Sequence, residues 1–347
     1  MNIRELLQVA VQRGASDLHL SAGQPPWLRV DGDLCRLALP PLDQACVLQG
    51  LADVMSEAQQ QRQRRDLDAD FSLSLPGLGR FRVATFLQDR GTAAVFRLIP
   101  DAVPTLAQLG LGAVFQRLAD LPRGLVCVTG PTGSGKSTTL AALLDHINAH
   151  RQCHILTIED PIEFVHSSQR SLVSQREVDR HARSFAAALR AALREDPDVI
   201  LIGELRDLET VRLALTAAET GHLVLATLHT ASAAKTIDRI IDVFPAEEKD
   251  MVRAMLSESL VAVISQTLCK LKDGSGRVAA HEIMLGTSAI RNLIREAKVA
   301  QMYSAIQTGN SVGMQTLDQN LTDLVRRNII SPAEARSKAK IPENFPG

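Results

Sequence analysis

A glycine-rich segment at residues 130–139, GPTGSGKSTT, constrains the possible folds more than any other part of the chain. It fits the pattern G-x-x-x-x-G-K-[ST] in full, and it lies between an apolar run, GLVCVTG, and a predicted helix over 136–150. In this context, backbone N–H groups of the turn and the N-terminal end of the helix form a binding site for phosphate. The segment therefore predicts a nucleoside triphosphate site within an α/β fold.

The side chains of this segment have separate expected roles. Gly133 and Gly135 allow the backbone to approach phosphate oxygens closely. Lys136 would neutralise charge on the β- and γ-phosphates, and the Ser137 hydroxyl would bind Mg²⁺, so the predicted cofactors are ATP and Mg²⁺. The predicted nucleotide-binding residues are Gly130, Thr132, Gly133, Ser134, Gly135, Lys136, Ser137 and Thr138.

The length and the residue patterns predict two domains. A chain of 347 residues exceeds what one hydrophobic core usually holds. Residues 1–99 have the pattern of a small α+β domain, with a helix predicted over 44–65 and paired strands over 71–99. The two prolines of 100–105 predict a linker. Strands and helices alternate over 106–347, which predicts a mainly parallel sheet covered on both faces, followed by C-terminal helices.

Acidic residues follow two of the predicted buried strands. Glu204 comes just after the strand at 199–202, where a carboxylate can hold Mg²⁺ or its bound water. The segment TIEDPIEF places Glu159, Asp160 and Glu163 directly after the strand CHILTI. One of these acids could orient a water in line with the γ-phosphate, and the pattern alone leaves open which one.

Two histidines flank the next predicted strand, HLVLATL. A single histidine at a strand end is usually a capping or packing residue. Because His222 and His229 stand at the two ends of one strand, the pair favours a sensor of the γ-phosphate.

Composition argues against several other classes of protein. The net charge is −1 and aromatic residues make up 3%, which disfavours nucleic-acid binding. The five cysteines include no CxxC pair, so a zinc ribbon is not expected. No apolar run approaches ~18 residues, and charged residues at positions 4 and 5 argue against a signal peptide, so we expect a cytoplasmic protein.

The sequence as a whole resembles the PilT family of type IV pilus retraction ATPases, within the bacterial secretion ATPases. The resemblance covers almost the entire chain and includes GASDLHLSAG, GRFRV, ILTIEDPIEFVH, LREDPD, GELRDLET, TAAETGHLV, TLHTASAAKTIDR, VFPAEEK, AAHEIM and KIPENF. The segments AIRNLIRE and KVAQMYSAIQTG are more specific to this family than the P-loop is, and they distinguish this branch from generic secretion ATPases. The resemblance implies a PAS-like α+β N-terminal domain and a RecA-like P-loop ATPase domain with a mainly parallel sheet.

The resemblance also implies residue roles. Glu163 matches the catalytic glutamate that polarises the attacking water, Glu204 matches the Walker B acid, and AIRNLIRE matches an element tied to retraction. The residues implied to take part in catalysis are Glu163, Glu204, Arg82, Arg97, His222 and His229. The resemblance implies that the two arginines reach the phosphates when the domains close. The residues implied to support the metal are Ser137, Glu204 and Glu159.

The implied assembly is a homohexamer at the inner-membrane base of a pilus. Its implied partners are the inner-membrane platform protein and a PilU-type paralogue, and no nucleic acid is expected. Three alternatives stay open: a RecA-type nucleic-acid motor, a nucleotide-gated scaffold, and a PilU or pilus-extension ATPase. The missing four-cysteine element argues against a type II assembly ATPase, and the ending KIPENF favours the retraction branch.

Overall fold

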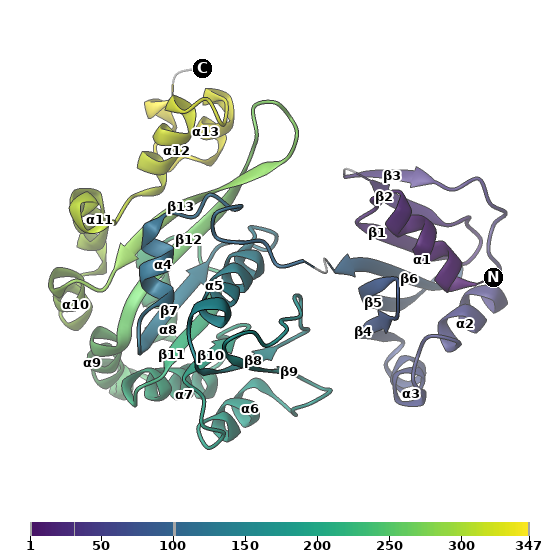
Figure 1. The fold of residues 1–347 in the computed structure, drawn as a ribbon, viewed down its shortest axis with the longest axis horizontal. Helices are drawn as coiled ribbons and strands as arrows, with labels where there is room; N and C mark the ends of the chain where they lie inside the picture. Colours follow the sequence, from purple (N-terminus) through teal and green to yellow (C-terminus); the bar gives the residue numbers. More distant parts are fainter. Residues whose placement is uncertain (1, 31, 100–101, 346–347) are drawn as a thin grey trace. The chain divides into compact units, whose positions relative to one another are not determined.

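The computed structural model describes residues 2–30, 32–99 and 102–345, and Figure 1 labels its elements. Contacts divide the chain into two units. The first consists of Met1–Ala102 with Pro161–Val165, and the second consists of Val103–Asp160 with His166–Gly347. The predicted linker at 100–105 includes residues 100 and 101, which lie outside the described residues.

The first unit is an antiparallel sheet with helices. Its described strands form one sheet in the order β3-β2-β1-β6-β5-β4, and Leu7, Leu18, Leu28 and Phe81 are among its most buried side chains. The predicted α+β class of this region is thus what the structure has. Its elements are α1 (Ile3–Gln12), β1 (Asp17–Ser21), β2 (Trp27–Val30), β3 (Asp33–Arg36), α2 (Gln44–Ala52), α3 (Glu57–Asp66), β4 (Asp68–Leu75), β5 (Gly79–Gln88) and β6 (Gly91–Ile99).

The single helix predicted over 44–65 is wrong, because the structure has two helices there. Helix α2 ends at Ala52, and a new N-terminus forms at Ser56. The Ser56 hydroxyl accepts a hydrogen bond from the N–H of Gln59, whose side chain accepts one from the Ser56 N–H. This reciprocal cap satisfies two backbone donors and favours a fresh helix start over continuation.

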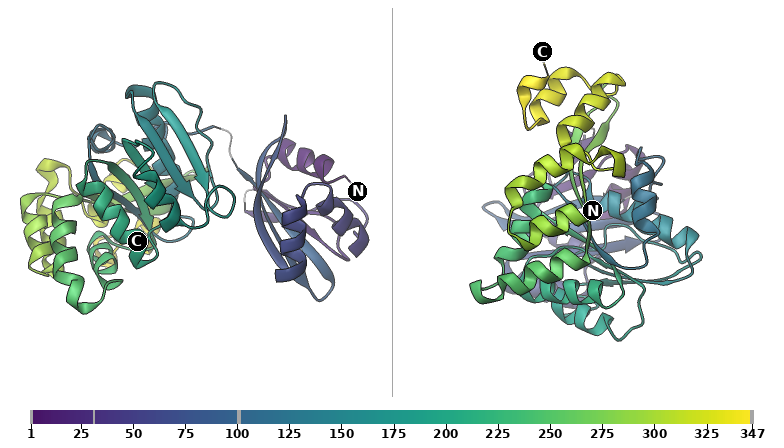
Figure 2. Two further views of the ribbon diagram at one scale, coloured as in Figure 1. Left: turned by 90° about the horizontal axis from the view of Figure 1, so that it is seen from below. Right: turned by 90° about the vertical axis from the view of Figure 1, so that its left-hand side faces the viewer.

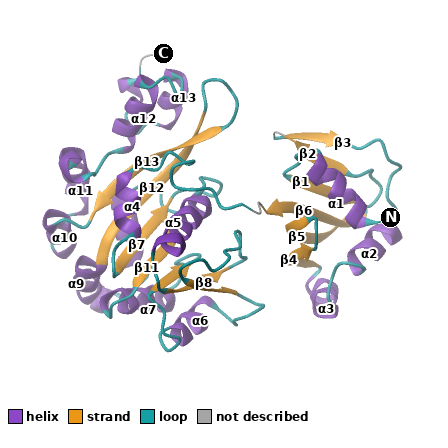
Figure 3. Ribbon diagram, viewed as in Figure 1, coloured by secondary structure: helices purple, strands orange, loops and turns teal. Residues whose placement is uncertain are grey.

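The second unit is built on a larger, mainly parallel sheet, drawn in orange in Figure 3. Its described strands have the order β13-β12-β7-β11-β10-β8-β9, and only the β12–β13 pairing is antiparallel. The predicted parallel sheet is confirmed. The strands are β7 (Gly124–Thr129), β8 (His154–Glu159), β9 (Leu172–Glu177), β10 (Val199–Ile202), β11 (Leu223–Leu228), β12 (Leu260–Lys270) and β13 (Arg277–Leu285).

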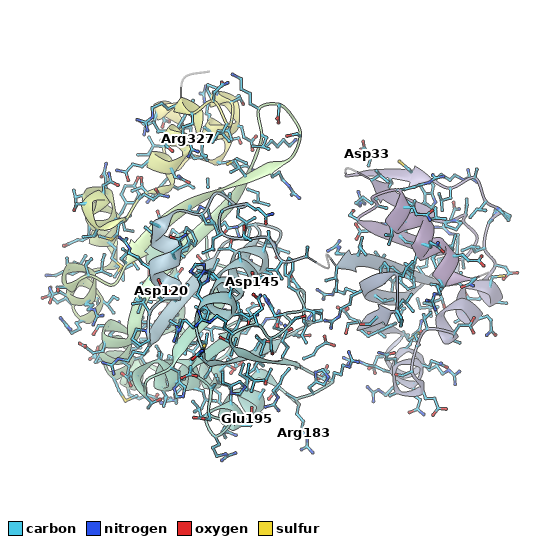
Figure 4. All side chains as sticks on the ribbon, in the orientation of Figure 1. Asp33, Asp120, Asp145, Arg183, Glu195 and Arg327 are labelled. Carbon is cyan, nitrogen blue, oxygen red and sulfur yellow. The ribbon has the colours of Figure 1, made fainter. Side chains whose placement is uncertain are left out.

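Helices cover both faces of this sheet, as Figure 2 shows from two further directions. Alternate residues of β7 enter opposite cores: Val126 packs with α4 and α5, whereas Leu125 packs with α6 to α11. In Figure 4, Asp120 after α4 and Asp145 on α5 mark the first of these two faces. The helices are α4 (Ala113–Ala119), α5 (Lys136–His150), α6 (Phe185–Ala192), α7 (Leu208–Glu219), α8 (Ala233–Asp242), α9 (Lys249–Ser259), α10 (Ser288–Arg295) and α11 (Met302–Thr308).

Two further helices close the chain. Helices α12 (Leu317–Arg326) and α13 (Pro332–Lys338) pack on the far end of the β12–β13 hairpin, where Leu321 and Ile330 bury Cys269. The buried Asp318 carboxylate accepts hydrogen bonds from the backbone N–H groups of Lys340 and Ile341, which fixes the segment after α13. In the described ranges, no helix has both the length and the apolar character needed to cross a membrane.

Candidate active site

Four parallel strands bring their carboxyl ends to one edge of the second unit's sheet. Strands β7, β11, β10 and β8 lie side by side in this order. Because they run in the same direction, the residues that follow them meet at the same edge. The residues in question follow the strands at 130, 229, 203–204 and 160.

The segment at 130–138, called the P-loop below, leads from β7 into α5 through glycines in conformations that other residues rarely adopt. Gly130 has φ of 144°, and an added Cβ would lie 2.3 Å from the carbonyl oxygen of Gln266. Gly135 has φ of 86° and is the N-cap of α5. Within the described residues, the buried Ser134 hydroxyl has no hydrogen-bond partner, which fits a loop that receives a polar ligand. The predicted motif therefore has the strand–turn–helix setting that phosphate binding requires.

Lys136 lies at the start of α5 with only 8% of its surface exposed. Its Nζ donates to the carbonyl oxygens of Gly130 at 2.9 Å and Pro131 at 3.0 Å. The same nitrogen lies 3.4 Å from Nδ1 of His229, which follows β11. The ammonium group is thus held inside the P-loop, where it can offset phosphate charge.

The Glu204 carboxylate lies between His229 and the guanidinium group of Arg206. Its Oε2 lies 3.3 Å from Nε2 of His229 and 2.7 Å from a guanidinium nitrogen of Arg206. Burial raises the pKa of Glu204, but the hydrogen bond from Arg206 and the nearby His229 outweigh it and hold the pKa below its usual value. Glu204 is therefore an anion at neutral pH, which suits a metal-supporting role.

Glu159 ends β8 beside this cluster. Its Oε1 accepts hydrogen bonds from the Thr157 hydroxyl at 2.7 Å and the Gln175 amide at 3.1 Å. The chain of β8 lies next to Gly203, since an added Cβ there would come within 3.3 Å of the Glu159 Cα. Asp160 is exposed. The pKa of Arg206 is raised mainly by its hydrogen bond with Glu204, and the charge of Asp160 adds to this effect. Two of the three acids in the segment TIEDPIEF, Glu159 and Asp160, are thus at this edge.

Glu163 follows the end of β8 by four residues, in the segment Pro161–Val165 that groups with the first unit. Its side chain is exposed, whereas its neighbours Ile162 and Phe164 are buried. The alternation anchors the segment through its apolar residues and leaves the carboxylate free of burial.

His222 does not lie with His229. It precedes β11, whose first residue pairs with Gly124 at the start of β7, so His222 is at the edge of the sheet opposite the P-loop. Its Nδ1 lies 2.9 Å from the carbonyl oxygen of Ala217. A strand of six residues separates the two histidines by about 20 Å. The structure therefore does not bring His222 to the P-loop of its own chain.

Arg82 and Arg97 lie opposite each other on β5 and β6 of the first unit, so both side chains leave the same face of the sheet. Arg82 binds Asp70 at 2.5 Å, and Arg97 Nε donates to Asp17 Oδ1 at 2.8 Å. Both guanidinium groups are substantially exposed, whereas the Asp17 side chain is buried. The two predicted arginines are therefore adjacent, and each has a carboxylate partner.

Two residues of this site, Arg206 and Gln266, are not among those predicted from the sequence. Arg206 stands two positions after Glu204 in GELRD, and a cation so close to a predicted metal-supporting acid was a signal that could have found it. Gln266 on β12 hydrogen bonds to Ser134, which is 132 residues away, so no local pattern could have revealed this contact.

The donors at the P-loop fit Mg²⁺ held partly by phosphate. The half-buried Ser137 hydroxyl and the ionised Glu204 are hard oxygen ligands, which this cation prefers. No three histidine, cysteine or acidic side chains form a metal cage in the part of the chain that the structure describes. Mg²⁺ in nucleotide sites commonly takes only one or two protein ligands.

A P-loop with its lysine at the carboxyl edge of a parallel sheet, beside an acid that follows a neighbouring strand, defines a nucleotide-hydrolysing protein of the P-loop class. A model of the type II/IV secretion system protein family matches residues 1–335. The chain therefore belongs to this family. The fold class predicted from the sequence is confirmed.

Comparisons with single proteins narrow the position within the family. The chain is 66% identical over 345 residues to the type IV pilus retraction ATPase PilT of Pseudomonas aeruginosa, covering 99% of this chain and 100% of the relative. It is 58% identical over 320 residues to a twitching motility protein of Neisseria gonorrhoeae, covering 92% and 86%. A crystal structure of the pilus retraction motor PilT with bound ADP superposes with a TM-score of 0.92 at 46% identity, covering 99% and 98%. The predicted resemblance to the PilT family is confirmed, and the predicted ATPase activity agrees with these names.

Proposed function

We propose that this chain is an ATP-hydrolysing motor that powers retraction of a type IV pilus. The observation that carries the proposal is the P-loop with Lys136, His229 and Glu204 joined at one edge of the sheet. This arrangement combines phosphate binding with an acid for metal support, which a scaffold without turnover does not need. We infer that hydrolysis drives pilus retraction from the similarity of the whole chain to a pilus retraction ATPase.

Each site residue has a proposed role in hydrolysis. The P-loop N–H groups and Lys136 bind the phosphates, and Ser137, Glu204 and Glu159 support Mg²⁺, which would screen phosphate charge when bound. Glu163 orients the attacking water, and His229 senses the γ-phosphate through its contact with Lys136. Arg82 and Arg97 offset charge that develops on the triphosphate; arginines in this role are worth ~10³–10⁵ in rate. Since His222 lies at the far edge of the sheet, we propose that it acts on a neighbouring subunit.

The proposed assembly is a homohexamer that works against the inner-membrane platform protein of the pilus, assisted by a PilU-type paralogue. Its proposed location is cytoplasmic, peripheral to the inner membrane at the base of the pilus. Nucleotide-dependent movement between the two units would deliver the work, because only contacts that differ between nucleotide states can drive such movement. The segment 289–296, AIRNLIRE, forms most of α10 and is the proposed retraction element.

The function is tested by replacing the P-loop lysine. Lys136→Ala should weaken nucleotide binding and lower hydrolysis at least ~100-fold, because a buried charge that faces phosphate is lost. A bacterium lacking its own retraction ATPase should regain fibre retraction with the wild-type chain and not with this variant. Lys272→Ala is the matched control, since Lys272 contacts Asn328 on the surface far along the β12–β13 hairpin. Retraction by the Lys136 variant would contradict the proposal.

A second prediction concerns the water-orienting acid. Glu163→Gln should keep nucleotide affinity within about threefold and lower kcat by at least ~100-fold, because general-base contributions are of this size. The measurement is phosphate release against equilibrium nucleotide binding. Glu195→Gln, on an exposed carboxylate paired with Arg176, is the control and should behave as wild type. If Glu163→Gln turns over normally, the water is oriented by another of the clustered acids.

A further inference from the structure

A buried glutamine outside the motif residues ties the P-loop together. Gln266 lies on β12 with 3% of its surface exposed. Its Nε2 donates to the backbone carbonyl of Ser134 at 2.6 Å, and its Oε1 accepts from the Thr139 hydroxyl at 2.8 Å. Ser134 belongs to the loop, and Thr139 belongs to the first turn of α5. One side chain therefore bridges the two parts of the chain that present N–H groups to phosphate.

The backbone of the P-loop also packs on Gln266. An added Cβ at Gly130 would lie 2.3 Å from the Gln266 carbonyl oxygen, and one at Gly135 would lie 2.9 Å from its Nε2. Both ends of the glycine turn are thus in close contact with the same residue. Because the neighbouring Ser265 pairs with Thr129 in the parallel β12–β7 ladder, the sheet fixes where Gln266 stands.

The chemistry of the amide fits this position closely. Gln266 uses its donor end and its acceptor end on two different partners, and both contacts are buried. A carboxylate at neutral pH offers no donor, and an apolar side chain offers neither group. Loss of either contact would leave a buried polar group without its partner, and the P-loop would shift to find another.

We propose that Gln266 is a positioning residue that holds the P-loop and the first turn of α5 in the shape that receives nucleotide phosphates. It acts through Ser134 and Thr139 and does not itself touch the phosphates. The inference rests on the proposed function only in taking a nucleotide as the ligand. It adds a residue of β12 to a site otherwise built from β7, β8, β10 and β11.

The test measures equilibrium affinity of the purified full-length chain for a fluorescent ADP analogue, so that no turnover is needed. Gln266→Met keeps the length of the side chain and removes both polar ends. Thr139→Val keeps the shape and removes the hydroxyl. Thr139→Val loses one buried hydrogen bond and should weaken affinity by about tenfold, and Gln266→Met loses two and should weaken it by at least as much. Thr139→Ser keeps the hydroxyl and should restore affinity to within about twofold of wild type.

Two comparisons separate positioning from general stability. In the double variant Gln266→Met/Thr139→Val the two losses should not add, since Gln266→Met already removes the contact that Thr139→Val removes. Cys269→Ala on the same strand removes a buried thiol in the separate cluster of Leu321 and Ile330, so it should lower the melting temperature and leave affinity unchanged.

The proposal is overturned if Thr139→Val and a folded Gln266→Met both bind the ADP analogue within twofold of wild type. It is also overturned if affinity falls only in proportion to melting temperature, as Cys269→Ala would reveal. Should Gln266→Met fail to fold, the Thr139→Val and Thr139→Ser pair decides the outcome. A wild-type chain that binds ADP but releases no phosphate contradicts the proposed function and leaves this inference standing.

Discussion

Arg97 is held by a carboxylate whose ionisation depends on it. Burial raises the pKa of Asp17, but hydrogen bonds from Ser16 and Arg97 outweigh burial and hold the pKa below its usual value. Asp17 also lies 4.0 Å from Arg29, so the acid links three strands of the first unit. For Arg97 to reach a nucleotide, as we propose, this ion pair must loosen or move with it.

The lowered pKa predicts a pH dependence. A carboxyl group with a depressed folded-state pKa stabilises the fold above its unfolded pKa, and this contribution is lost as pH falls through the folded value. Asp17→Asn should therefore destabilise the chain by about 1 kcal/mol at pH 7, a small value because Arg97 is largely exposed. It should also flatten the loss of stability below about pH 4.

The measurement is urea denaturation of wild type and Asp17→Asn from pH 7 to pH 3. Asp33→Asn on the exposed strand β3, labelled in Figure 4, is the control and should follow wild type throughout. Curves of stability against pH that coincide for wild type and Asp17→Asn would mean that the Asp17 pair contributes nothing to stability.

The positions of single residues were predictable wherever they depended on local sequence. The P-loop and Glu204 follow their strands directly, so motif and spacing were enough to place them. His222 and His229 lie at opposite ends of the six-residue strand β11, so the distance between them could have been worked out from the sequence. Gln266 was beyond prediction, since its partners are brought together only by the order of strands in the sheet.

At the scale of elements, α3 depends on its ends more than on packing. None of its described residues is buried, and it begins with the reciprocal cap of Ser56 and Gln59. Its C-cap, Leu67, has φ of 64°, a left-handed conformation that is unfavourable for leucine. Helix α12 has the same type of cap at Thr316 but buries Leu321 and Leu324.

This contrast gives a prediction. Ser56→Ala should destabilise α3 locally by about 1 kcal/mol and speed amide hydrogen exchange across Glu57–Asp66 several-fold. Thr316→Ala should change exchange across α12 less, because burial of its apolar face supplies most of its stability. Equal effects on the two helices would show that packing of α3 has been underestimated.

Element prediction failed where the sequence pattern was mixed. Strand β9 was missed because LVSQRE carries mostly polar, half-exposed residues at the edge of the sheet. The break between α2 and α3 was missed because Ser56 and Gln59 form a cap inside a run with otherwise helical composition. Buried strands such as β7 and β11, whose residues are all buried, were predictable from apolar runs alone.

At the scale of the whole molecule, the proposed ring makes each subunit depend on its neighbours. Arg82 and Arg97 lie on strands of the first unit, and His222 lies at the opposite edge of the second unit's sheet. None of these three residues belongs to the edge that carries the P-loop. If subunits act in concert, an inactive subunit should impair active ones within the same ring. If they act alone, activity should fall only in proportion to dilution.

Mixing wild type with Lys136→Ala subunits distinguishes these cases. With equal amounts of the two and random assembly into hexamers, phosphate release per wild-type subunit should fall to well below half, because few rings contain only active subunits. The mixing control is Lys272→Ala, which should leave the rate unchanged. Sedimentation in the presence of ADP should establish first that the mixed material sediments as six chains. A rate that stays proportional to the wild-type fraction would mean that the subunits hydrolyse ATP independently, and the coupling of one site to the next would have to be abandoned.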